Sequence, residues 1–177
     1  MIFILNKLRT KNLALFFVVL LSSFSVYSGI RLAGTKIELL SPSMLKGTLG
    51  DNVTLEFVPK PLPHIKIIDT KSPNLILAYA FNSADLQVSA KGYKDLVDCY
   101  VLLSPEGKII SVMLGDNKET KKYLKRVLDG KLLKSWEGKK SSETTPDSIS
   151  GATFTSKAVN GSVKAVLDKL SEVHFFK

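Results

Sequence analysis

The sequence predicts an α+β fold behind a hydrophobic N-terminal segment. Runs rich in β-forming residues, LILAYAF at 75–81 and LVDCYVLLS at 96–104, are bounded by glycine and proline turns. After Gly115 the apolar residues recur at helical spacing instead. Strands, one hairpin and two or three helices in this order, without an internal repeat, indicate one antiparallel sheet with flanking helices.

The N-terminal segment has the length and composition of a membrane span. Residues 13–30, LALFFVVLLSSFSVYSGI, contain no charged side chain, and a helix of 18 residues just crosses the roughly 30 Å hydrocarbon layer. Lys7, Arg9 and Lys11 precede it, and this excess of positive charge favours an N-terminus on the cytoplasmic side. We therefore expect a single-pass protein of the inner (cytoplasmic) membrane whose remainder lies outside the cytoplasm.

A cleaved signal peptide is the alternative interpretation of the same segment. Val26 to Ser28 offer small or apolar residues before a possible cleavage after Ser28, and four serines lower the hydrophobicity of the span. The expected organisation is a cytoplasmic N-terminus at 1–12, a transmembrane helix at 13–30, an extended connector at 31–74 and a single folded domain at 75–177. Both interpretations place the domain outside the cytoplasm.

The predicted connector contains one strand. Its glycines and prolines break helices, and VTLEFV at 53–58 has the composition of a strand. VPKPLPH at 58–64 is expected to be a polyproline-like link into the domain.

The domain begins with three predicted strands. The first is 75–81; the second, 96–104, turns through Pro105 to Gly107 into KIISVML at 108–114, which makes a β-hairpin. An amphipathic helix carrying Tyr123 follows, ends near Gly130, and is expected to be capped by Asp116 or Asn117.

A polar loop, GKKSSETTPDS at 138–148, separates this helix from the last one. The last helix is expected to begin at about Ser156. Its apolar residues share one face, namely Ala158, Val159, Val163, Val166, Leu167 and Leu170.

Composition narrows the possible functions. Cys99 is the only cysteine, so no internal disulfide is expected, and its apolar neighbours indicate a buried residue. Only His64 and His174 could join it as ligands, so we expect no His/Cys metal site. Residues 118–140 hold nine Lys or Arg against three acids. Export makes nucleic acid a poor partner, so this basic segment is either a solvated helix face or a surface that steers an acidic redox partner or balances a phosphate.

The run SISGATFTSK, residues 148–157, is the strongest candidate site. It leads into a helix N-terminus, where unpaired backbone N–H groups and the helix dipole favour an anion, phosphate above all. Gly151 allows close approach, and Ser150, Thr153, Thr155 and Ser156 add hydroxyl donors. Ordinary helix capping, for which Thr155 or Ser156 would serve, is the alternative, but a cap needs only one hydroxyl.

Residues 147–153, DSISGAT, followed by Phe154-Thr155-Ser156, resemble the D-x-x-S/T-G-A-T flavinylation motif of the FMN-binding domains in Rnf and Na⁺-translocating NADH:quinone oxidoreductase complexes. The resemblance extends over roughly 75–170 through Gly92-Tyr93, PEGKIISVML, Trp136 and Gly138-Lys139, and the membrane anchor matches too. It implies that Thr153 is esterified to the phosphate of FMN by a separate flavin transferase.

The resemblance also implies the remaining site residues. Ser150, Gly151, Ala152, Thr155 and Ser156 would surround the cofactor, and Asp147 would serve recognition by the transferase. Glu119-Thr120 resembles the start of the family's E-T-P-G-L-G flavin-contact element, with Tyr123 at the leucine position, although Lys121-Lys122 replace the proline and glycine. No separate catalytic residues are implied.

The short chain with one predicted span is most similar to the G subunit of Rnf complexes. That resemblance implies a redox subunit, without a complete active site of its own, in a cation-translocating ferredoxin:NAD oxidoreductase, with the other membrane subunits as partners. The alternatives are a C-like subunit of the Na⁺-translocating quinone reductase, a stand-alone exported electron-transfer flavoprotein, and a binding module whose flavin site has degenerated.

Overall fold

The computed structural model describes residues 40, 42–140 and 145–176. The chain separates into two compact units, Met1–Leu40 and Ser41–Lys177, and the fold below is that of the second. The predicted cytoplasmic N-terminus at 1–12, the span at 13–30 and its alternative cleavage site lie outside the described residues. Among the helices that the structure does describe, none has the length and apolar character needed to cross a membrane.

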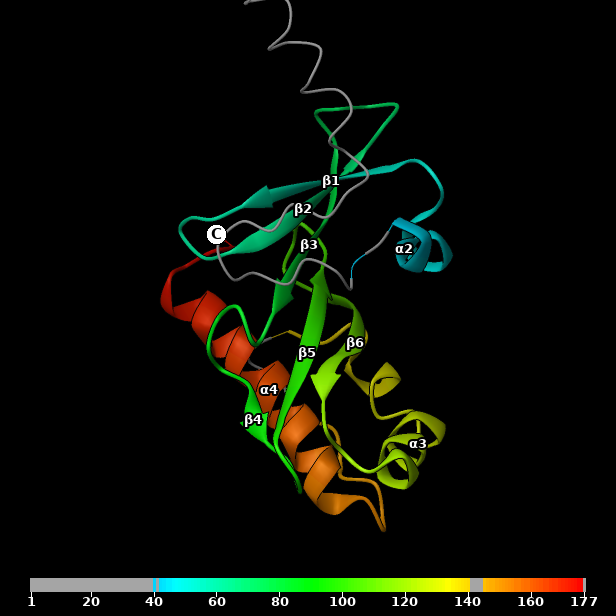
Figure 1. The fold of residues 1–177 in the computed structure, drawn as a ribbon. Helices are drawn as coiled ribbons and strands as arrows, with labels where there is room; N and C mark the ends of the chain where they lie inside the picture. Colours follow the sequence, from blue (N-terminus) through cyan, green and yellow to red (C-terminus); the bar gives the residue numbers. More distant parts are fainter. Residues whose placement is uncertain (1–39, 41, 141–144, 177) are drawn as a thin grey trace, which may run out of the picture. The chain divides into compact units, whose positions relative to one another are not determined.

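In the described part of the chain, one helix precedes a run of strands and further helices follow it, as Figure 1 shows. The elements are α2 (Pro42–Leu49), β1 (Val53–Val58), β2 (His64–Asp69), β3 (Ile76–Asn82), β4 (Ala90–Lys91), β5 (Leu96–Leu103), β6 (Ile109–Asn117), α3 (Lys121–Asp129), the short 3₁₀ helix η2 (Lys134–Trp136) and α4 (Thr153–Glu172).

The strands form one antiparallel sheet in the order β1-β2-β3-β5-β4, and β6 pairs with the remaining side of β5. The α+β class with an antiparallel sheet is thereby confirmed. The predicted 105–107 hairpin is also confirmed, because β5 pairs with β6 across it, with Val101 opposite Val112.

The predicted boundary between residues 74 and 75 differs from the structure. The segment 53–69 forms β1 and β2, which pair with each other and then with β3, so it belongs to the sheet and is not an extended connector. The proline-rich stretch at 58–64 accordingly spans the turn between β1 and β2. Apolar residues of these strands, such as Ile65 and Ile67, are buried, and that burial holds the hairpin in the domain.

Two helix starts also differ from the sequence prediction. Asn117 pairs with Val97 at the end of β6, so it cannot cap α3; Thr120 occupies the cap position instead, without a side-chain cap bond. The last helix begins at Thr153, three residues before the predicted start. Thr155 and Ser156 therefore lie inside its first turn, and neither is its N-cap.

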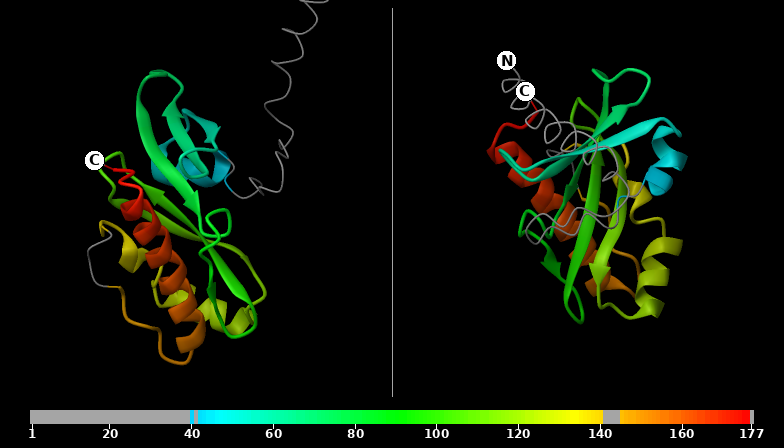
Figure 2. Two further views of the ribbon diagram at one scale, coloured as in Figure 1. Left: turned by 90° about the vertical axis from the view of Figure 1, so that its left-hand side faces the viewer. Right: turned by 45° about the horizontal axis from the view of Figure 1, so that its top comes forward.

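Helix α4 runs along one face of the sheet, as the left view of Figure 2 shows, and buried side chains of α4, the sheet, α3 and η2 form the core. The apolar face predicted for the last helix is confirmed, since all six of its residues are buried. Each of its buried valine and leucine side chains contributes about 1.5–3 kcal/mol relative to exposure. Cys99 is likewise fully buried, and burial raises the pKa of its thiol to about 12, which leaves it a protonated packing residue.

In addition to the apolar face, hydrogen bonds hold neighbouring segments to α4. The buried Trp136 indole donates to Asn160 Oδ1 at 2.9 Å, and Asn160 Nδ2 donates to the carbonyl of Pro146 at 2.7 Å. On the next turn, Ser162 Oγ donates to the Val97 carbonyl at 2.7 Å and accepts the N–H of Ala90 at 2.8 Å. The loop before α4 and the edge strand β4 are thus both held to the helix.

Candidate functional site: the N-terminal end of helix α4

Three segments meet at the start of α4, toward the lower end of the molecule in Figure 1: the turn between β4 and β5, the junction of β6 with α3, and the loop that leads into α4. The Glu119 carboxylate joins them. Its Oε1 accepts the backbone N–H of Lys94 at 2.8 Å, and its Oε2 accepts the hydroxyl of Thr155 at 2.5 Å. Glu119 itself is buried.

The structure separates the five hydroxyls of residues 148–157 into two groups. Thr155 and Ser156 are buried and bonded, the first to Glu119 and the second by accepting the Ile149 N–H at 3.0 Å. Ser148, Ser150 and Thr153 are exposed. The Thr153 hydroxyl forms no hydrogen bond within the part of the chain that the structure describes, so it is accessible to a reagent.

The backbone at the start of α4 is suited to an anion. The first helical bond runs from the Ser156 N–H to the Ala152 carbonyl at 2.9 Å, and Ala152 provides no side-chain cap. Among the described residues, no acceptor takes the N–H groups of Thr153, Phe154 or Thr155. Three unpaired donors at the positive end of a 20-residue helix form a phosphate-binding arrangement.

The backbone conformation of Gly151 favours glycine, because its φ of 74° lies in the left-handed region. An added Cβ would also lie 2.0 Å from Nη1 of Arg126 and would displace that guanidinium from the loop. That guanidinium donates to the Gly151 carbonyl at 2.9 Å and so holds a positive charge beside the loop. Arg126 was not among the predicted site residues. The only sequence signal for it was its place in the basic segment 118–140.

Three aromatic side chains surround the same end of α4. Tyr93 comes from the β4–β5 turn, Tyr123 from the first turn of α3 and Phe154 from the first turn of α4. The centroid of the Tyr93 ring lies 6.2 Å from that of Tyr123 and 6.4 Å from that of Phe154. We call these three residues the aromatic trio. Of these three, Tyr123 is a residue predicted from the sequence to lie at the site, and Tyr93 belongs only to the Gly92-Tyr93 pair of the resemblance.

The other predicted site residues fall in the same region in different environments. Asp147 and Ser150 are exposed on the loop before α4, and Ala152 is buried. Thr120 is half-buried at the start of α3. Glu119 was predicted to contact the cofactor; in the structure both of its carboxylate oxygens are engaged by protein donors.

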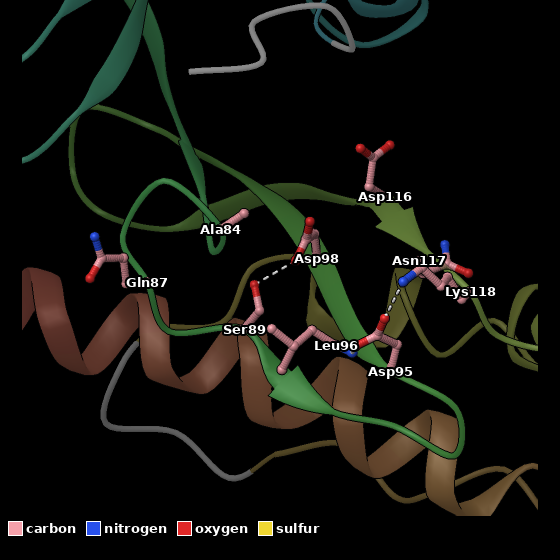
Figure 3. Close-up of a pocket in the computed structure, with 9 residues that line it drawn as sticks. All are labelled: Ala84, Gln87, Ser89, Asp95, Leu96, Asp98, Asp116, Asn117 and Lys118. Carbon is pink, nitrogen blue, oxygen red and sulfur yellow. Dashed lines mark hydrogen bonds and ion pairs between the residues drawn. The ribbon is translucent and has the colours of Figure 1, made fainter. Parts of the chain in front are cut away.

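A separate acidic cleft of about 660 Å³ lies beside β5, as Figure 3 shows. Its carboxylates have partners: Ser89 Oγ donates to Asp98 at 2.7 Å, and Lys118 forms an ion pair with Asp95 at 2.7 Å. The hydrogen bond from Lys118 lowers the pKa of Asp95, and burial together with the Asp98 charge raises that of nearby Asp85. No residue of 145–156 lines this cleft.

The structure is that of an α+β domain in which the start of helix α4 presents backbone donors suited to an anion. Residues 92–168 match the family model of the FMN-binding domain. This range runs from the β4–β5 turn through the loop at 145–152 and most of α4, so it contains every residue of the site described above. The match supports the FMN-binding domain family and a flavin-binding, redox-related role. No curated protein matches the sequence.

Proposed function

We propose that this protein carries FMN on Thr153 through a phosphoester bond and relays electrons as the G-type subunit of a membrane-bound, cation-translocating Rnf complex. The observation that carries the proposal is the Thr153 hydroxyl: it is exposed and unbonded, it begins α4, and it lies within the family match.

The surrounding residues fit a phosphate at this hydroxyl. The unpaired N–H groups of the first turn and the Arg126 guanidinium would offset its negative charge, and Gly151 leaves the backbone close to it. Thr155 and Ser156 hold the loop through their bonds to Glu119 and Ile149. When bound, FMN supplies one- and two-electron chemistry, and the protein supplies attachment and surroundings.

Attachment needs a second protein and an activated flavin. Phosphoester formation from free phosphate and an alcohol would release water and is unfavourable in water, so the donor is a flavin phosphoanhydride bound by a flavin transferase. The threonine oxygen forms a bond to the flavin-side phosphorus, the anhydride bond breaks, the hydroxyl proton is released, and the remaining nucleotide leaves. Thr153 at the start of α4 and Asp147 on the loop before it are both exposed, so this segment is accessible to the transferase.

The proposed location follows from residues 13–30. This segment would anchor the domain on the extracytoplasmic side of the inner membrane. A cofactor that is covalently tethered to the domain cannot diffuse away from there. The segment contains no ionisable side chain, so cation translocation belongs to the other membrane subunits.

A stand-alone exported flavoprotein is the second candidate, favoured by the serine-rich and marginally hydrophobic segment 13–30. Fractionation of the native cells separates the two. The Rnf proposal expects a full-length protein that co-purifies with integral membrane subunits. A soluble, processed and solitary product would contradict it, and co-purification with a Na⁺-translocating quinone reductase would replace it with the C-like role.

The flavin attachment itself is tested by co-expression with a flavin transferase. The wild-type chain is expected to show flavin fluorescence in a denaturing gel and a mass increase equal to one FMN phosphoester. Thr153→Val should lose both signals, whereas Ser148→Ala, which removes another exposed hydroxyl of the same loop, should keep them. Retention of the flavin by Thr153→Val would refute the assignment, and its absence from the wild-type chain would favour a degenerate site.

A further inference from the structure

We propose that the aromatic trio, Tyr93, Tyr123 and Phe154, is the platform that receives the isoalloxazine ring of the flavin. This inference rests on the proposed attachment to Thr153 and assigns to Tyr93 and Phe154 a role that the resemblance does not give them. The platform would order the ring against the protein, whereas attachment alone would leave it mobile on its tether.

Exposure is the first argument. Tyr93, in the turn between β4 and β5, is 62% exposed, and Phe154, in the first turn of α4, is 69% exposed. Aromatic side chains that converge from three elements and remain open to solvent indicate a surface for a ligand or partner. Tyr123, the third member of the trio, is half-buried against the core, so Tyr93 and Phe154 form most of its exposed surface.

The position of Glu119 is the second argument. Its two carboxylate oxygens bond the N–H of Lys94 and the hydroxyl of Thr155, and each of these residues directly follows a member of the trio. Glu119 therefore fixes the Tyr93 and Phe154 backbones next to each other. Gly92 completes this arrangement, since a Cβ there would lie 2.8 Å from Oε1 of Glu119.

Adjacency to Thr153 identifies the occupant. Phe154 follows Thr153 in the chain, so a ring tethered through the Thr153 phosphate starts beside the platform. An isoalloxazine ring is flat, largely apolar and suited to stacking on aromatic faces. Arg126 and the free N–H groups lie on the phosphate side of the same helix end, so the charged and the flat parts of the cofactor each find a matching surface.

Tyr93→Leu is the main test, because Tyr93 is remote in sequence from the motif at 147–153 that the transferase is expected to recognise. Flavin content is measured by denaturing-gel fluorescence, and ring ordering by two signals of the native flavinylated protein: emission relative to the same sample after unfolding, and visible circular dichroism. A phenol in contact with a flavin quenches its emission. We expect wild-type emission to rise severalfold on unfolding and the Tyr93→Leu protein to lose part of this quenching, because the phenol of Tyr123 remains.

Two further variants sharpen the test. Tyr93→Phe should retain the visible circular dichroism, because it preserves the ring face, and Phe154→Leu should reduce that signal. Leu128→Ala, which changes an exposed apolar residue of α3 outside the trio, should leave both signals as in the wild type.

The possible outcomes separate the platform from the attachment. Absence of gel fluorescence from the wild-type chain would overturn both proposals. Attached flavin whose native emission already equals that of the unfolded sample, or whose signals are unchanged by Tyr93→Leu and Phe154→Leu, would overturn the platform alone. In that case the trio would be a docking surface for a partner protein.

Discussion

The two ends of α4 carry aromatic clusters that differ in how they are closed. At the C-terminal end, the rings pack at centroid distances of 5.0 to 5.8 Å, with Phe81 fully buried among them. This cluster comprises His64, Tyr79, Phe81, Phe175 and Phe176. At the N-terminal end, the rings of the trio are spaced at 6.2 and 6.4 Å, and two of them, Tyr93 and Phe154, are exposed to solvent.

This difference indicates different roles for the two clusters: the C-terminal cluster stabilises the fold, and the trio is available for binding. The C-terminal cluster joins β2, β3 and the chain end, with Phe81 and His64 buried and Tyr79, Phe175 and Phe176 half-buried around them, so its contribution goes mainly into folding. In the trio, Tyr93 and Phe154 leave most of their surface exposed, so the free energy of burying these two rings remains for a ligand. Residue type alone does not distinguish the clusters; exposure does.

The largest expected contrast comes from shortening one ring in each cluster. Phe81→Ala should lower the free energy of unfolding by about 3–5 kcal/mol, because it removes a fully buried ring and leaves a cavity. Phe154→Ala should change it by less than about 0.5 kcal/mol, as at an ordinary surface position. Urea unfolding of the flavin-free proteins measures both, and a loss at Phe154 comparable to that at Phe81 would remove the contrast.

A smaller effect is expected at the bond that supports the trio. Thr155→Val removes the donor to buried Glu119 and should cost about 1–3 kcal/mol, since one carboxylate oxygen loses its partner. Thr153→Val, two residues earlier and exposed, is the matched control and should be nearly neutral in the same urea experiment. Equal stabilities for the two variants would show that the Glu119 bridge contributes little to folding.

The C-terminal cluster is also expected to make the stability of the protein depend on pH, through His64. Burial lowers the pKa of His64 below its ordinary value of 6.5. The hydrogen bond to the Leu62 carbonyl and the negative charge of Glu56 raise this pKa, and the positive charge of Lys66 lowers it further. As pH falls below 6.5, the unfolded chain binds the proton more readily than the folded one, so stability decreases. Thermal unfolding of His64→Phe between pH 7.5 and 5.5 should show a shallower decrease than the wild type, and an unchanged slope would contradict this assignment.

The sequence predicted the parts of the fold that depend on local patterns. The β5–β6 hairpin and the buried face of α4 follow from alternation, turn residues and helical spacing, all of which lie within a few residues. The pairing of β1 and β2 with the sheet was missed because strand partners are non-local and the proline-rich turn resembled a linker. The early start of α4 was missed because its N-cap, Ala152, carries no capping side chain.

The candidate site divides in the same way. Residues 148–157 were identified from sequence because the hydroxyls, the glycine and the helix start are contiguous. Contacts across the chain were not identifiable: Arg126 reaches Gly151 from another helix, and Tyr93 meets Phe154 only through folding. Likewise, sequence could not show that Thr155 and Ser156 are engaged internally while Thr153 is accessible.

The central claim, that the accessible Thr153 is the residue that bears the flavin, is tested most directly by peptide mapping. Trypsin cleavage after Lys140 and Lys157 releases residues 141–157, a peptide with nine serine or threonine hydroxyls. Fragmentation of this peptide from the flavinylated protein should locate the FMN phosphoester on Thr153. Its location on any of the other eight hydroxyls, or on a different peptide, would contradict the account.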